Sequence, residues 1–97
     1  MDMILQQRIE RLKSLLRERI LVLDGAMGSA IQFANISSKD FGGDRHEGCN
    51  EHLVLTRPQL IESIHNSYLE AGCDIIETNT FGGTPFVLEE FDLGNKA

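Results

Sequence analysis

The sequence has little cysteine, no long hydrophobic run and few basic residues. Its two cysteines, Cys49 and Cys73, are too few for the disulfide framework of a small secreted domain. No apolar run approaches the ~18–20 residues that a membrane-spanning helix needs. The net charge of −6 argues against nucleic acid binding, which depends on a basic face. We therefore expect a cytoplasmic protein with reduced thiols and with no membrane or nucleic acid partner.

The overall composition is typical of one globular domain. The chain of 97 residues is 41% hydrophobic and 25% charged, close to the ~45–50% and ~25% of soluble domains. Leu5, Ile9, Leu12 and Leu16 recur at helical spacing within residues 3–19. This pattern predicts an N-terminal amphipathic helix that docks on the rest of the chain. A membrane-surface helix or a transit peptide is disfavoured, because acidic residues are interspersed among the basic ones.

Two apolar runs predict parallel strands that are buried on both faces. Residues 20–23 are too few for a helix and too uniformly apolar for a half-exposed strand, and residues 73–77 contain a similar run. The first run stops at Asp24-Gly25 and the second at Glu77. A helix predicted between them makes a βαβ unit, in which the carboxyl ends of both strands lie at one edge.

The segment between the two runs predicts a long loop and then a helix. Residues 34–55 are polar and glycine-rich, as in the loops that form active sites on the strand-to-helix face of a barrel. Thr56 and Gln59 have capping-box spacing, and Pro58 suits a first helical turn. The predicted helix therefore begins at Thr56 and ends before Gly72, which is a typical residue after a helix.

Two shorter helices are expected after the strands. Residues 26–33 follow the first strand, and residues 86–91 follow Thr84-Pro85, a typical helix start, and end near Gly94. Two strands do not make a stable parallel sheet. We therefore expect the chain to be the front part of a larger α/β domain.

Asp24 and Glu77 are the candidate chemical residues. Both end predicted strands, so their side chains would emerge at the same edge of the sheet. A pair of carboxylates there can hold an ammonium group, orient a metal-ligand shell or act as acid and base. Helix capping and hydrogen bonds to loop amides are the alternative. Asn79 and Thr80 add neutral hydrogen-bonding groups beside Glu77.

Other patterns are weaker. The Gly25–Gly28 turn has the glycines of a phosphate-binding turn, but it lacks both the G-x-G-x-x-G spacing and the lysine of a P-loop. His46, Cys49 and His52 have zinc-like spacing without a fourth soft ligand, so we expect ordinary loop residues there. His65 is expected at the surface or the boundary of its helix.

Several segments together have a distinctive sequence. Residues 19–28, 48–51, 56–58, 64–72 and 74–81 read RILVLDGAMG, GCNE, TRP, IHNSYLEAG and DIIETNTF. In this order they resemble the start of the homocysteine-binding barrel of the cobalamin-dependent methionine synthase family. That family has a (β/α)₈ TIM-barrel fold. The resemblance implies that residues 1–97 are a truncated homocysteine-binding domain: an N-terminal helix over 1–19, then about two βα units over 20–97.

The resemblance also implies a reaction, the transfer of a methyl group to the sulfur of homocysteine to give methionine. Methylcobalamin would be the donor, recharged from methyltetrahydrofolate by further domains. Zinc bound by three cysteines would activate the thiol. Those cysteines are expected beyond residue 97, so neither Cys49 nor Cys73 is predicted to be a ligand. No catalytic residue is expected within the chain, which would be inactive alone.

The resemblance assigns the substrate residues to the ends of the two strands. It implies that the amino acid part of homocysteine is bound by five residues: Asp24, Gly25, Glu77, Asn79 and Thr80. It places two further residues in the loop over the pocket: Asn50 and Glu51. The alternatives are a homocysteine methyltransferase that uses betaine or S-methylmethionine, and a non-catalytic barrel piece that folds only with a partner.

Overall fold

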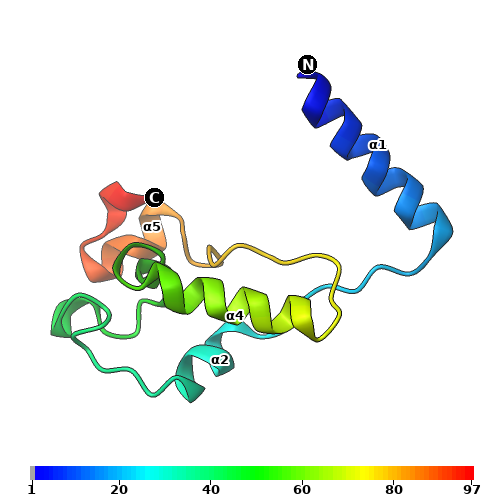
Figure 1. The fold of residues 1–97 in the computed structure, drawn as a ribbon. Coiled ribbons are helices and arrows are strands. Elements are labelled where there is room, and N and C mark those ends of the chain that lie inside the picture. The colour runs from blue at the N-terminus through cyan, green and yellow to red at the C-terminus, as the bar shows by residue number, and fades with distance from the viewer. Residues whose placement is uncertain (1) are drawn as a thin grey trace.

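The computed structural model describes residues 2–97, which form helices joined by extended and turn-rich segments (Figure 1). The α-helices are α1 (Met3–Glu18), α2 (Met27–Phe33), α3 (Leu53–Thr56), α4 (Pro58–Glu70) and α5 (Pro85–Leu88). Short 3-10 helices are η1 (Asp44–His46), η2 (Asn50–His52), η3 (Glu89–Phe91) and η4 (Gly94–Lys96). None of the helices in this part of the chain has the length and apolar character needed to cross a membrane.

Helix α4 carries the main core. It buries Ile61 and Ile64, which join Ile31 of α2, Phe41 of the long loop and Leu53 of α3 in one apolar cluster. Leu60 and Tyr68 also pack against this cluster, so α4 presents one apolar side to the core. A second, smaller cluster joins the loop to the C-terminal helices through Cys49, Leu88 and Leu93.

The predicted start of α4 is wrong by two residues. Thr56 is not the cap; it is the last residue of α3, where its hydroxyl donates to the His52 carbonyl oxygen at 3.4 Å. Arg57 separates the two helices with φ −139° and ψ 62°. A residue before proline is disfavoured in the helical region, which is why Pro58 breaks the chain at Arg57 and begins a new helix.

Two other helix ends follow their sequence signals. At the end of α4, Gly72 has φ +108°, and the Cys73 N–H donates to the Tyr68 carbonyl oxygen at 3.2 Å, as in a Schellman motif. At the start of α5, the Thr84 hydroxyl accepts from the Val87 N–H at 3.3 Å. The helical run that α5 and η3 form ends at Phe91, as predicted, but the residue with positive φ that closes it is Asp92 (φ +58°) and not Gly94.

The two predicted strands are not formed in the described residues; the two runs are extended segments that meet at a single parallel bridge, between Leu23 and Ile75. The Asp24 N–H donates to the Ile75 carbonyl oxygen at 2.9 Å, and the Asp74 N–H donates to Val22 at 2.8 Å. Burial on both faces is not observed, because Ile20 is 88% exposed and Val22 54%. Within residues 2–97 there is no third segment to pair with and no second layer to cover the faces.

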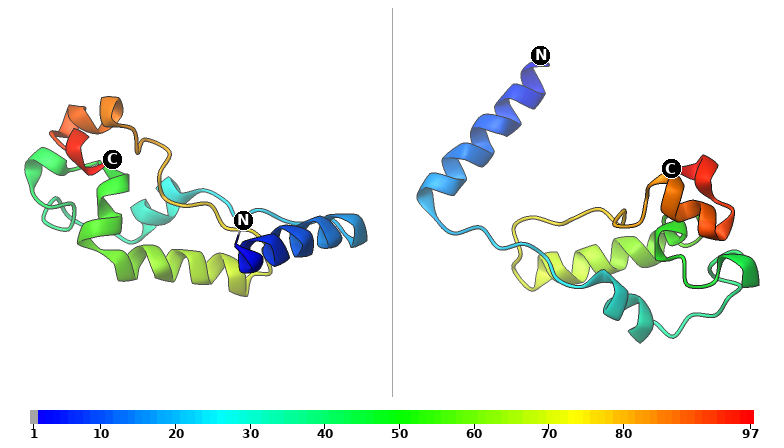
Figure 2. Two further views of the ribbon diagram at one scale, coloured as in Figure 1. Left: turned by 90° about the horizontal axis from the view of Figure 1, so that it is seen from above. Right: turned by 180° about the vertical axis from the view of Figure 1, so that it is seen from behind.

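Helix α1 ends at Glu18, one residue before the predicted end, and it does not dock on the rest of the chain as predicted. The Asp2 side chain caps it by accepting from the Ile4 N–H at 2.8 Å. None of its described residues is buried, and it projects away from the rest of the chain (Figure 1, Figure 2). Its apolar side is exposed at Leu5, Leu12 and Leu16. Helical periodicity establishes that such a side exists, but it does not identify what the side contacts.

Candidate functional site

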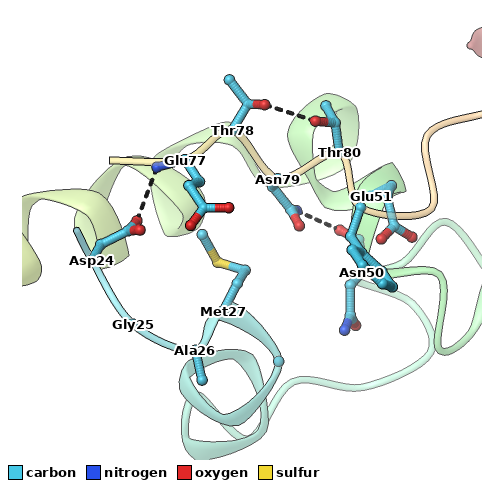
Figure 3. Close-up of a pocket in the computed structure, with 12 residues that line it drawn as sticks. Asp24, Gly25, Ala26, Met27, Asn50, Glu51, Glu77, Thr78, Asn79 and Thr80 are labelled. Atoms are coloured by element: carbon cyan, nitrogen blue, oxygen red, sulfur yellow. Dashed lines mark hydrogen bonds between the residues drawn. The ribbon is translucent and has the colours of Figure 1, made fainter. Parts of the chain in front are cut away.

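A pocket of about 390 Å³ lies where the two extended segments end (Figure 3). All seven residues proposed from the sequence line it: Asp24, Gly25, Asn50, Glu51, Glu77, Asn79 and Thr80. The sequence reasoning missed five further lining residues: Ala26, Met27, Gly28, Thr78 and Phe81. The structure therefore brings together residues from three separate parts of the chain.

Asp24 connects the ends of the two segments. Its side chain is only 4% exposed. Its Oδ2 atom accepts a hydrogen bond from the Glu77 N–H at 3.2 Å and lies 4.0 Å from Nδ1 of His65. In residues 2–97, no hydrogen bond to Oδ1 is formed. One oxygen of this carboxylate is therefore engaged by the protein, and the other is free for a ligand.

Glu77 and Met27 face the same space. Figure 3 shows both side chains pointing into the region between Asp24 and Asn50. The Glu77 carboxylate is exposed, and it has no hydrogen-bond or ion-pair partner among the described residues. Two carboxylates on one pocket attract a cation, and the Met27 thioether adds a polarisable apolar wall.

The turn at Gly25 is held by Tyr68. The Tyr68 hydroxyl donates to the Ala26 carbonyl oxygen at 2.7 Å. A Cβ atom at position 25 would lie 3.0 Å from both Oη and Cε1 of Tyr68. The absence of a side chain at Gly25 therefore lets the Tyr68 ring approach this turn closely, whether or not Gly25 contacts a ligand.

The loop over the pocket is tied down by two side-chain contacts. The buried Asn79 donates through Nδ2 to the Asn50 carbonyl oxygen at 2.7 Å. Glu51 Oε2 accepts from the Gly82 N–H at 3.2 Å. These contacts cross between the loop and the second segment, so Asn79 and Glu51 shape the pocket wall in addition to lining it. Thr80 is exposed, and its hydroxyl is hydrogen-bonded to that of Thr78 at 2.7 Å.

The amino ends of the two segments are joined by Asp74. Its carboxylate forms an ion pair with Arg19 at 2.8 Å and accepts from the Val22 N–H at 2.9 Å. The hydrogen bond from the Arg19 guanidinium, followed by the one from Val22, holds the pKa of Asp74 below its ordinary value. The sequence shows only that each segment carries a charged residue, so the ion pair between Arg19 and Asp74 cannot be predicted from it.

The two thiols are not arranged as metal ligands. Burial raises the pKa of Cys49, whose Sγ lies 4.0 Å from Glu51 Oε1. Burial and the nearby carboxylates of Asp24 and Asp74 raise the pKa of Cys73. Zinc binds thiolates, which these environments disfavour. From Asp2 to Ala97 there is no group of three or more metal-binding side chains.

The histidines of the loop pack on each other and do not surround an ion. The rings of His46 and His52 meet edge to face with centroids 4.8 Å apart. His52 Nδ1 is hydrogen-bonded to the Phe41 carbonyl oxygen at 2.6 Å. His65, in the middle of α4, is partly buried with a side chain 17% exposed, and its Nδ1 atom lies 4.0 Å from Asp24 Oδ2.

Comparison with known proteins gives concordant matches. Residues 21–97 match the family described as homocysteine S-methyltransferase. The chain is 48% identical over 81 residues to the methionine synthase of Mycobacterium leprae, an alignment that covers 84% of this chain and 7% of that protein. It is 46% identical over 85 residues to the methionine synthase of Mycobacterium tuberculosis, covering 88% and 7% respectively. The chain thus spans a small part of the length of these relatives.

Proposed function

The chain belongs to the homocysteine S-methyltransferase family, and we propose that its pocket binds the amino acid part of homocysteine for methylation of the thiol to methionine. In this proposal residues 1–97 are part of a homocysteine-binding TIM barrel within a longer methyltransferase. One observation carries the proposal: both carboxylates at the segment ends, Asp24 and Glu77, line the same pocket beneath the Asn50-Glu51 loop.

The chemistry of the pocket suits an amino acid. The free Oδ1 of Asp24 and the unpaired Glu77 carboxylate supply negative charge for the ammonium group, and charge-assisted hydrogen bonds are the stronger kind. Asp24 is nearly buried, so water competes weakly for it. The Met27 side chain would contact the methylene groups of the substrate, and Thr80 would add a hydroxyl for its polar atoms.

Among the described residues, no group of side chains fits the zinc ion of the proposed reaction. Cys49 is buried beside Glu51, while Cys73 lies on a different segment, so neither belongs to a set of zinc ligands. We assign the zinc ion, which would activate the thiol, and methylcobalamin, which would donate the methyl group, to other parts of the longer protein. The methyltetrahydrofolate-binding domain is assigned likewise. The role of this chain is then to bind and orient the substrate.

Asp24→Asn in the full-length protein tests the proposal. The substitution keeps the size of the side chain and one oxygen for the Glu77 N–H, but removes the charge. We expect the homocysteine KM to rise by about tenfold or more, the scale of a hydrogen bond to a charged group, with zinc content unchanged. Asp44→Asn removes an exposed carboxylate outside the pocket and should leave KM unchanged. Loss of zinc with normal homocysteine binding would show that the assigned role is wrong.

A further inference from the structure

His65 lies next to Asp24 but does not line the pocket. It belongs to α4, one turn before Tyr68, and its Nδ1 atom is 4.0 Å from Asp24 Oδ2. Tyr68 contacts the backbone of the same turn through Ala26. Two side chains on one face of α4 therefore support the segment that carries Asp24, one through a carbonyl oxygen and the other next to the carboxylate.

The Nδ1 atom of His65 is buried and has no hydrogen-bond partner in the described chain. A buried polar atom without a partner is unfavourable, and such atoms are rare in proteins. Asp24 Oδ2 is a charged acceptor 4.0 Å away, beyond hydrogen-bond length but within ion-pair distance. A shift of about 1 Å by either side chain would bring the two atoms to the usual hydrogen-bond length.

We propose that His65 is a positioning residue for Asp24, donating from Nδ1 to Oδ2 when a ligand occupies the pocket. With Oδ2 held by the His65 N–H and the Glu77 N–H, the carboxylate cannot rotate, and Oδ1 faces the pocket. An Oδ1 atom fixed in this way binds an ammonium group with less loss of side-chain entropy. This inference rests on the proposed function, because it concerns how Asp24 meets the amino group of the substrate.

Two substitutions separate hydrogen-bond donation from simple packing. His65→Phe keeps a ring but removes the donor, whereas His65→Asn keeps a donor near the Nδ1 position but removes ring volume. In the full-length protein we expect His65→Phe to raise the homocysteine KM by about fivefold to tenfold, within the range for a hydrogen bond to a charged group. We expect His65→Asn to restore KM to within about twofold of wild type, while kcat at saturating homocysteine changes little in either.

The reverse order of effects would overturn the proposal. If the ring only fills space, His65→Phe keeps the wild-type KM and His65→Asn does not. Equal increases in both variants would also exclude donation from Nδ1. Should either variant fail to fold by circular dichroism, ¹⁵N spectra of histidine-labelled wild-type protein with homocysteine bound decide the question. Protonated Nδ1 at His65 supports the proposal, and an Nε2-protonated neutral ring contradicts it.

Asp24→Asn distinguishes this inference from the proposed function. If Asp24→Asn leaves the homocysteine KM unchanged, the assignment of Asp24 to substrate binding fails, and the role of His65 fails with it. If Asp24→Asn raises KM but His65→Phe does not, the proposed function stands and only the positioning role is wrong. His65→Phe in the Asp24→Asn background should add little, because the two residues act on the same contact.

Discussion

The Tyr68 hydroxyl donates to the Ala26 carbonyl oxygen at 2.7 Å, a contact between residues 42 positions apart. It joins the middle of α4 to the turn that follows the first extended segment. Because Ala26 lines the pocket, the position of the pocket floor depends on a helix that does not itself line the pocket. Substitutions at Tyr68, which supports the pocket without lining it, should therefore affect the pocket as well.

Tyr68→Phe should loosen this turn without disturbing the core. The ring remains packed against the apolar cluster, and only the hydrogen bond is lost, which costs about 1 kcal/mol of the free energy of unfolding. Hydrogen exchange followed by mass spectrometry should show faster exchange in peptides covering residues 24–28. Ser67→Ala is the matched control, since its hydroxyl bonds only to the Ile64 carbonyl oxygen within α4. Equal exchange in Tyr68→Phe and wild type would contradict the assigned role.

Gly25→Ala should be destabilising because of the same tyrosine. The added Cβ would sit 3.0 Å from Tyr68 Oη, so the ring must move and the bond to Ala26 is strained. Overpacking of this kind typically costs ~1–3 kcal/mol. The cost should fall in a Tyr68→Leu background, which a double-mutant cycle on the free energy of unfolding measures. Additive effects of the two substitutions would show that Tyr68 is not the obstacle.

The sequence predicted the helices and the gathering of the pocket residues better than the sheet. Local signals define the apolar stripe of α4, its Gly72 ending and the Thr84 cap, because each depends on neighbouring residues. The position of the pocket follows from one rule of topology: the carboxyl ends of parallel segments lie at the same edge, so the residues that follow them lie close together. The resemblance supplied the Asn50-Glu51 loop, which no spacing argument placed over that edge.

What could not be predicted depends on contacts between distant residues. An apolar run such as residues 20–23 indicates a buried strand only if other strands and helices cover it, and those are not among the described residues. At Arg57 two local preferences compete. The capping pattern favours a helix that starts at Thr56, whereas Pro58 disfavours a helical conformation at Arg57, and the effect of the proline is stronger. The proximity of His65 to Asp24 could not be predicted, because only the folded chain shows which segment α4 contacts.

Asp74→Asn should weaken the pairing of the two extended segments in a pH-dependent way. The pKa of Asp74 is lowered in the folded state, first by the Arg19 hydrogen bond and then by the Val22 N–H. The ionised carboxylate therefore stabilises the fold above its unfolded pKa of about 3.9, and this contribution is lost as the pH falls through the lower, folded pKa. The wild type should thus be more stable than Asp74→Asn at pH 7, with the difference shrinking below about pH 4.

Urea unfolding at pH 7 and at pH 3 measures this difference. Asp44→Asn is a suitable control, because it removes a carboxylate that forms no ion pair in the described structure. A stability difference between wild type and Asp74→Asn that stays constant from pH 7 to pH 3 would show that the charge of Asp74 does not contribute. High salt should also reduce the difference at pH 7, since Arg19 is half exposed and the pair is screened.

Asn79→Asp should release the loop over the pocket. The buried Asn79 amide donates to the Asn50 carbonyl oxygen at 2.7 Å, whereas a carboxylate there would place two acceptors against each other and bury a charge. We expect a loss of ~1–3 kcal/mol in the free energy of unfolding, the range for an unsatisfied buried polar group. Limited proteolysis should then cleave within residues 42–52 faster. Asn66→Asp adds the same charge at an exposed position on α4 and should leave cleavage unchanged. Equal cleavage rates in the two variants would mean that the hydrogen bond between Asn79 and Asn50 does not hold the loop in place.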